Sequence, residues 1–309
     1  MRKINKDFDT IPNVLIEKGT SEKKGSLLQI QDAISRQKGN KYSSYQNVYK
    51  KLKTLYHNKC AYCEEKVIKE NELQNGEVSE RKKDATIDHY RPKDAGYYWL
   101  GNEWTNLLFA CATCNEAIKK KQFPINANKA ILPTNVQLFD VNNVFDRTHF
   151  RADKVFLLAE EPLLLHPEID TPKEHLTFDS WGRIKALTER GEKTIQVLKL
   201  QRFDDDRNAI IGKIIVLIKL LHKELFSKEI EIDKYNKDLQ KLCCTKIFFL
   251  QSVEKEFSFW YQYLSENFEA CILNLLENEY DFSSQEIVHI KAIFEECKET
   301  ITAKLSHYD

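Results

Sequence analysis

Cys60-Ala-Tyr-Cys63 and Cys111-Ala-Thr-Cys114 are two C-x-x-C pairs, with 47 residues between Cys63 and Cys111. Four thiolates held two by two form a tetrahedral structural zinc site, and sulfur at all four positions excludes a catalytic water. The separation is longer than in an ordinary zinc ribbon, so an intervening element must bring the pairs together. The spacing therefore predicts Cys60, Cys63, Cys111 and Cys114 as ligands of a structural Zn²⁺, with His57 as a surplus competitor. The alternative is four unliganded core cysteines.

The segment between the two pairs predicts a small hairpin followed by a helix. Residues 86–90 are typical of a short strand and residues 104–110 of a second one, while 111–121 open a helix. Residues 64–84 are polar and rich in Glu, Lys and Asn, which indicates a surface excursion.

Asp88 and His89 lie in this hairpin, Asn106 follows His89 by seventeen residues, and Asn115 comes directly after Cys114. This order resembles the HNH nuclease motif of the ββα-metal fold. The resemblance implies that His89 is the general base and that Asn106 braces the hairpin. It also implies that Asp88 and Asn115 hold the catalytic divalent ion, Mg²⁺ or Mn²⁺.

The chemistry of phosphodiester hydrolysis requires the same residue types. A histidine with a pKa near neutrality is suited to take a proton from water. A hard cation held by carboxylate and amide oxygens neutralises charge on the phosphate. Basic side chains suit backbone phosphates, which favours Arg91, Lys93 and Lys119 as nucleic-acid contacts. The alternative for these cations is an ordinary solvated surface.

A closer resemblance comes from the flanking sequence, which is similar to PtuB-type HNH proteins of Septu anti-phage systems and of some retrons over roughly residues 1–215. The segments that carry it are Met1-Arg-Lys-Ile-Asn-Lys6, Lys59-Cys-Ala-Tyr-Cys-Glu64, Asp88-His-Tyr-Arg-Pro-Lys93, Tyr98-Trp-Leu100, Trp104-Thr-Asn-Leu107, Ala110 to Asn115, Phe123-Pro124 and Glu161-Pro-Leu-Leu-Leu-His-Pro167. Residues 63–88 are longer than the family pattern, and Leu200-Gln-Arg202 stands where Leu-Asn-Arg is expected. The resemblance implies an effector nuclease paired with an ABC- or OLD-type ATPase, PtuA in that family.

Composition predicts a mainly α protein with a small α+β module: a zinc-stabilised ββα-metal core plus a C-terminal helical domain. The 309 residues include only 9 Gly and 7 Pro, so turn residues are scarce and long helices are favoured. Residues 1–130 carry 24 Lys and Arg against 16 Asp and Glu, a net +8, and residues 131–309 carry 23 against 31, a net −8. This asymmetry fits nucleic acid at the basic end and a partner at the acidic end, although ordinary surface variation produces such splits too.

Four segments follow from these patterns: a helical lead-in (1–57), a zinc-knuckle HNH module (58–130), a mixed β and loop segment (131–190) and an acidic helical domain (191–309), the candidate partner-binding part. The patterns also predict short strands at 155–158 and 163–166, a hairpin of 176–178 with 184–186, helices over 191–200, 203–228, 231–252 and 253–277, and a last helix from the capping box Ser283-x-x-Glu286.

The N-terminus has no apolar signal region, and residues 209–221 are too short and too charged to span a membrane. We therefore expect a cytoplasmic protein without a membrane partner. Three functions stay open: a metal-dependent DNA nuclease, a nuclease directed at RNA and in particular tRNA, and a zinc-stabilised adaptor with a vestigial site. The motif addresses a phosphate and not a sugar, so it does not separate the first two.

Overall fold

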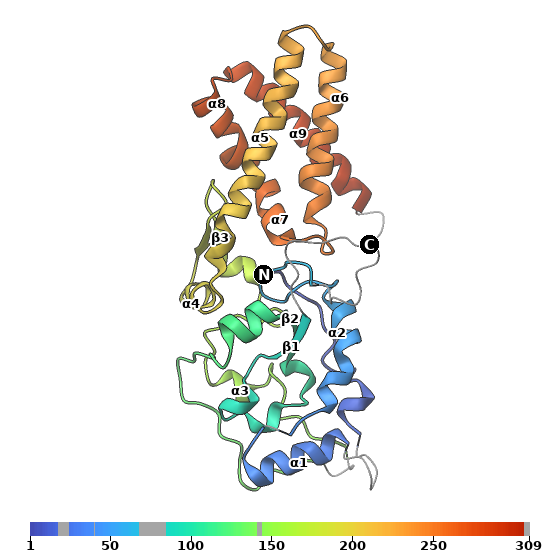
Figure 1. The fold of residues 1–309 in the computed structure, drawn as a ribbon, viewed down its shortest axis with the longest axis vertical. Helices are drawn as coiled ribbons and strands as arrows, with labels where there is room; N and C mark the ends of the chain where they lie inside the picture. Colours follow the sequence, from blue (N-terminus) through green and yellow to red (C-terminus); the bar gives the residue numbers. More distant parts are fainter. Residues whose placement is uncertain (18–24, 40, 68–84, 141–143, 306–309) are drawn as a thin grey trace. The chain divides into compact units, whose positions relative to one another are not determined.

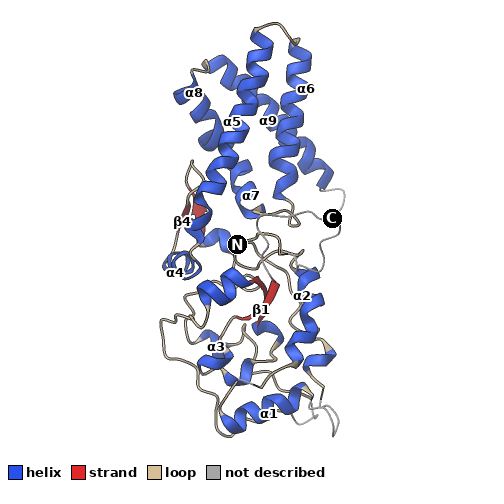
Figure 2. Ribbon diagram, viewed as in Figure 1, coloured by secondary structure: helices blue, strands red, loops and turns tan. Residues whose placement is uncertain are grey.

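The computed structural model describes residues 1–17, 25–39, 41–67, 85–140 and 144–305. The chain divides into two compact units: the first comprises Met1–His175 with Ala186–Lys199, and the second comprises Leu176–Lys185 with Leu200–Asp309. The four segments expected from the sequence remain a proposal beside this division. Helices dominate the described residues and the strands form two small hairpins, which confirms the mainly α prediction (Figure 2). Most of the expected surface excursion, residues 68–84, lies outside the described part of the chain.

The first unit combines short helices with one hairpin (Figure 1). Its elements are η1 (Asn13–Leu15), α1 (Ser26–Arg36), η2 (Ser44–Val48), α2 (Tyr49–Leu55), β1 (Ala85–His89), η4 (Lys93–Ala95), η5 (Tyr98–Leu100), η6 (Trp104–Asn106), β2 (Leu107–Cys111), the π-helical segment η7 (Thr113–Lys119), α3 (Val155–Leu158), η8 (Pro172–Glu174) and α4 (Glu189–Leu198).

The hairpin of β1 and β2 carries the functional motif. The two strands are antiparallel, with Ala85 opposite Cys111 and His89 opposite Leu107. All five residues of β2 are buried, while β1 has two buried residues, Ala85 and Asp88, and three half-buried ones. The polar end of β1 is therefore fixed against an apolar strand, and η7 follows β2 directly.

An apolar core supports the first unit and includes residues from the stretch that connects β1 to β2. α1 contributes Leu27, Ile30 and Ala33, which are three residues apart and therefore share one face of the helix. This face packs on η5, where Trp99 and Leu100 are completely buried. The core thus fixes the stretch between β1 and β2.

The second unit is helical apart from one hairpin. It consists of β3 (Leu176–Phe178), β4 (Ile184–Ala186), η9 (Leu200–Phe203), α5 (Asp204–Phe226), α6 (Ile232–Cys243), η10 (Cys244–Phe248), η11 (Phe249–Gln251), α7 (Ser258–Glu266), η12 (Glu269–Leu273), α8 (Asn274–Tyr280) and α9 (Ser284–Leu305). α6 packs against both α5 and α9 (Figure 1). Neither these helices nor any other described helix is both long and apolar enough to cross a membrane.

The predicted capping box at the start of α9 is confirmed. The backbone N–H of Ser283 donates to the Glu286 carboxylate at 2.6 Å, and the Glu286 N–H donates back to the Ser283 hydroxyl at 3.4 Å. This reciprocal pair satisfies two of the N–H groups that a helix start leaves free.

Three predicted strands are corrected by the structure. Residues 155–158 form the short helix α3, because an apolar run of four residues has no periodicity that separates strand from helix. Residues 163–166 form no strand, since their N–H groups pair with a loop carbonyl at Pro124 and with the Thr194 hydroxyl. The second hairpin strand starts at Leu107, because residues 104–106 form a 3-10 turn.

Candidate active site

The four predicted zinc ligands come together. The Sγ atoms of Cys60, Cys63, Cys111 and Cys114 all lie within 4.8 Å of one another and all four residues are buried. Cys63 Sγ and Cys111 Sγ are 4.0 Å apart, close to the ~3.8 Å that a tetrahedron with Zn–S bonds of about 2.3 Å requires. Hydrogen bonds from the neighbouring thiols hold the pKa of Cys111 far below its ordinary value. The donor set fits Zn²⁺, and His57 is not part of it.

Asn106 is the last residue of η6, directly before β2, and its side chain binds the loop that leaves β1. Its side-chain oxygen accepts from the Arg91 N–H at 2.7 Å, and its amide nitrogen donates to the carbonyls of Arg91 at 3.0 Å and Leu100 at 3.2 Å. Its own backbone carbonyl accepts from the Tyr90 N–H at 2.9 Å. The side chain is 1% exposed, so these bonds replace water completely. Asn106 therefore ties both ends of the loop together.

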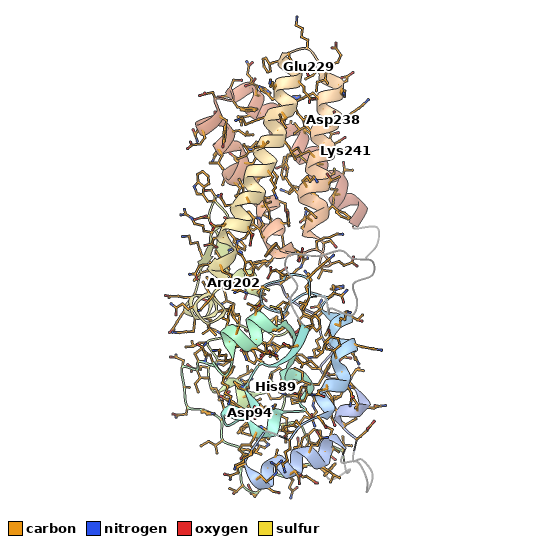
Figure 3. All side chains as sticks on the ribbon, viewed as in Figure 1. His89, Asp94, Arg202, Glu229, Asp238 and Lys241 are labelled. Atoms are coloured by element: carbon orange, nitrogen blue, oxygen red, sulfur yellow. The ribbon has the colours of Figure 1, made fainter. Side chains whose placement is uncertain are left out.

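His89, labelled in Figure 3, is the last residue of β1; it is half-buried and lines a pocket. Its Nε2 is 2.9 Å from the Gly101 carbonyl oxygen, which makes Nε2 the protonated nitrogen and Nδ1 the acceptor. The ring edge of Tyr45 packs against the imidazole, with the centroids 4.7 Å apart. Burial lowers the pKa of His89 to about 4, and the charge of Lys93 contributes in the same direction. The imidazole is therefore neutral at pH 7.

Gly101 holds its carbonyl in place by close packing. A Cβ on this residue would lie 2.1 Å from the ring of Tyr42, and Tyr42 belongs to the core that α1 and η5 form. The acceptor for His89 is thus positioned by the core and not by a flexible loop.

Asp88 is 2% exposed and its carboxylate is held by two side chains. The ammonium of Lys119, at the end of η7, lies 3.0 Å from each of the two carboxylate oxygens. The hydroxyl of Tyr62, between two zinc-cluster cysteines in the sequence, donates to Asp88 Oδ2. Two separate segments of the chain, η7 and the turn between Cys60 and Cys63, therefore fix the orientation of the carboxylate.

Asn115, in the first turn of η7, donates its amide nitrogen to the Thr86 hydroxyl at 3.0 Å and to the Ile87 carbonyl at 3.4 Å. The side-chain carbonyl oxygen is then the atom that this amide can offer to a metal. Asp88, His89 and Asn115 line one pocket of about 390 Å³. The pocket's other lining residues are Tyr45, Ile87, Pro92, Lys93, Asp94, Glu116, Lys120 and Lys121.

This donor set fits a hard divalent cation. Carboxylate and amide oxygens are the ligands that Mg²⁺ and Mn²⁺ prefer, and the pocket supplies them beside a neutral imidazole. Its volume leaves room for water and phosphate oxygens next to these groups. The zinc cluster differs, because its four thiolates close the coordination sphere.

Two of the three predicted phosphate contacts are corrected. Arg91 is 1% exposed, and its Nε lies 2.7 Å from Glu160 Oε2 while Nη2 donates to the Leu157 carbonyl. Lys119 is completely buried against Asp88. Both cations stabilise the interior and do not reach a bound phosphate. The third, Lys93, lines the pocket, where its ammonium is 2.9 Å from the Asp94 carboxylate.

The sequence interpretation missed several residues of this pocket. Lys120 and Lys121 directly follow Lys119 in the sequence, and they are exposed where Lys119 is buried. Glu116 follows Asn115 and adds a carboxylate to the lining. No sequence signal pointed to Tyr45 or to the hydroxyl of Tyr62.

Comparisons with known proteins point to the same region. Residues 60–121 match the family model described as HNH endonuclease. The chain is 33% identical over 186 residues to the Septu protein PtuB of Bacillus mycoides (strain KBAB4), which covers 55% of this chain and 52% of that protein. It is 30% identical over 216 residues to the Septu protein PtuA of the same strain, with 65% of this chain and 23% of that protein covered. The chain thus spans about half of the first relative and a quarter of the second, and no solved structure matches.

Proposed function

We propose, from the premise that residues 60–121 form an HNH endonuclease domain, that this chain is a metal-dependent endonuclease that hydrolyses phosphodiester bonds of nucleic acid. The observation that carries the proposal is the pocket that Asp88, His89 and Asn115 line together with several lysines. The intact set of pocket residues argues against an adaptor with a vestigial site.

His89 is the proposed general base. The Gly101 carbonyl fixes the protonated Nε2, so the lone pair of Nδ1 is free to accept a proton from an attacking water. The depressed pKa keeps the imidazole neutral before the reaction. Asn106 is the proposed positioning residue, because its hydrogen bonds hold the loop that begins directly after His89.

Asp88 and Asn115 are the proposed ligands of the catalytic ion, Mg²⁺ or Mn²⁺. When bound, such an ion polarises the phosphate and stabilises the charge on the departing oxygen. Lys93, Lys120 and Lys121 line the same pocket, and we assign them to the phosphates that flank the scissile bond. These contacts supply affinity without reading sequence.

The similarity to PtuB and PtuA supports a role of this chain in a Septu-type antiviral defence system. The sequence resemblance to PtuB-type proteins of retrons makes a retron system the second candidate. We further propose that an ABC- or OLD-type ATPase related to PtuA is the partner and that it docks on the acidic helical segment 191–309. A cytoplasmic location suits the four zinc thiolates, since a reducing compartment keeps them from forming disulfides.

Cleavage assays on supercoiled DNA and on a total tRNA pool, with Mg²⁺, Mn²⁺ or EDTA, test the activity and separate the two substrate classes. We expect cleavage with a divalent ion, and its loss in His89→Ala with fold and zinc content unchanged. His149→Ala, a half-buried histidine outside the pocket, is the matched control and keeps activity. If the chain remains inactive on both substrates even with the ATPase present, the adaptor function replaces the nuclease.

A further inference from the structure

The ammonium of Lys119 occupies the position beside Asp88 that a bound cation would take. It lies 3.0 Å from Asp88 Oδ1, 3.0 Å from Oδ2 and 3.0 Å from the backbone carbonyl of His89. These three oxygens match the three N–H donors of an ammonium. Lys119 is 0% exposed and Asp88 is 2% exposed, so water screens their attraction weakly.

The remaining charges of the pocket reinforce this picture. Three carboxylates line the pocket, those of Asp88, Asp94 and Glu116. Two of them are paired with lysines: Asp88 with Lys119 and Asp94 with Lys93. Lys120 and Lys121 add two further cations to the lining. Counted with Lys119, four positive side chains face three negative ones, so the free pocket disfavours a divalent cation.

We propose that Lys119 is a resident counter-ion of Asp88 that suppresses divalent-ion binding in the free protein, so that a nucleic-acid phosphate must enter before the catalytic ion binds tightly. Each phosphate brings the negative charge that Lys119 removes from the site. The ion and the substrate then bind cooperatively, because each lowers the electrostatic cost of the other. This inference rests on the proposed function for the identity of the site, but its test measures ion binding and not cleavage.

The first arm of the test is Mn²⁺ titration calorimetry on the full, zinc-loaded chain without nucleic acid. Lys119→Gln keeps an N–H donor for Asp88 and removes the charge, so we expect Mn²⁺ to bind at least about tenfold more tightly than to wild type. Lys50→Gln removes the same charge from an exposed position on α2 outside the pocket, where water and salt screen it, and we expect a change below about threefold. Equal or weaker Mn²⁺ binding by a folded Lys119→Gln protein would overturn the proposal.

A second arm covers the case in which Lys119→Gln does not fold. Asp88→Asn leaves Lys119 uncompensated, and we expect at least about tenfold weaker Mn²⁺ binding than wild type. The double variant Asp88→Asn with Lys119→Gln replaces the ion pair by a neutral pair of similar shape. We expect this variant to bind Mn²⁺ at least about threefold more tightly than Asp88→Asn alone, because the uncompensated ammonium is gone. A double variant as weak as Asp88→Asn alone would show that Lys119 does not oppose the ion.

Zinc content and circular dichroism establish the fold of each variant before titration. The outcomes also separate this inference from the proposed function. Tighter Mn²⁺ binding by Lys119→Gln supports the counter-ion, and if the wild-type chain cleaves nothing even with the ATPase present, the nuclease is refuted while the counter-ion stands. If instead His89→Ala removes metal-dependent cleavage and the Mn²⁺ affinity does not depend on Lys119, the nuclease is supported and the counter-ion role of Lys119 is refuted.

Discussion

The hydroxyl of Tyr62 donates a hydrogen bond to the carboxylate of Asp88. Tyr62 lies between Cys60 and Cys63 in the sequence and is completely buried. The zinc cluster and the candidate catalytic carboxylate are therefore separated by one side chain. Tyr62 thus links the cysteines that would hold the structural zinc to the residue proposed to hold the reacting metal.

Removal of the Tyr62 hydroxyl tests this link. We expect Tyr62→Phe to keep one zinc per chain and to lose about 1–3 kcal/mol of unfolding free energy, because a buried carboxylate loses a donor. Cleavage should fall as well, since Asp88 gains freedom to rotate. Urea unfolding and zinc analysis measure both effects. Tyr98→Phe, at a half-buried ring that packs on Trp99, should be near wild type, and an equal loss in both variants would contradict the link.

Loss of one zinc ligand should unfold the first unit. In Cys60→Ser we expect the first unit to lose zinc and its cooperative thermal transition, because metal-binding free energy is folding free energy in such modules. A strong chelator should produce the same change in wild type. Cys244→Ser, outside the cluster, should retain zinc. A chelated wild-type chain that melts at an unchanged temperature would refute a structural role for the cluster.

His166 should make the first unit sensitive to acid. Burial lowers the pKa of His166 to about 3 from its ordinary value of 6.5, and the ring bonds to the Thr105 carbonyl at 3.0 Å. The folded state thus favours the neutral ring, so this contribution to stability is complete above pH 6.5 and is lost as the pH falls toward 3. Between these limits the slope of unfolding free energy should exceed that of His166→Gln by up to about 1.4 kcal/mol per pH unit. Urea unfolding at pH 4 to 7 measures it, and parallel slopes would falsify the assignment.

Lys120 and Lys121 should govern the salt dependence of nucleic-acid binding. Each phosphate contact contributes about −0.9 to the slope of log K against log salt for duplex DNA, so the double Lys120→Gln, Lys121→Gln variant should reduce the slope by about 1 to 2. Fluorescence anisotropy over a salt series measures this slope. Lys50→Gln, an exposed lysine on α2, is the control. Identical slopes for the double variant and the control would exclude the pocket lysines as phosphate contacts.

The sequence predicted the parts of the site whose spacing is dictated by chemistry. Two C-x-x-C pairs favour a four-thiolate metal site, and the hairpin predicted between them puts Asp88 and His89 at a strand end. The strand boundaries shifted by a few residues, because residues 104–106 follow a turn conformation that apolar patterning does not reveal.

The sequence does not predict which basic side chains are buried in the fold. Lys and Arg are normally solvated, so the sequence predicts Arg91 and Lys119 as phosphate contacts. Their burial depends on Glu160 and Asp88, which lie 69 and 31 residues away in the sequence. Only the tertiary fold brings such partners together, and one member of a lysine run can be interior while its neighbours face solvent.

The packing of Gly101 against Tyr42 has a consequence for mutational tolerance. Gly101 does not line the pocket, yet any side chain there meets an aromatic ring of the core. The carbonyl that selects the tautomer of His89 would then move with it. A saturation scan of this chain should therefore find that almost no substitution is tolerated at position 101, although this residue touches neither metal nor substrate. A larger residue at position 101 would be accepted only together with a smaller residue at position 42.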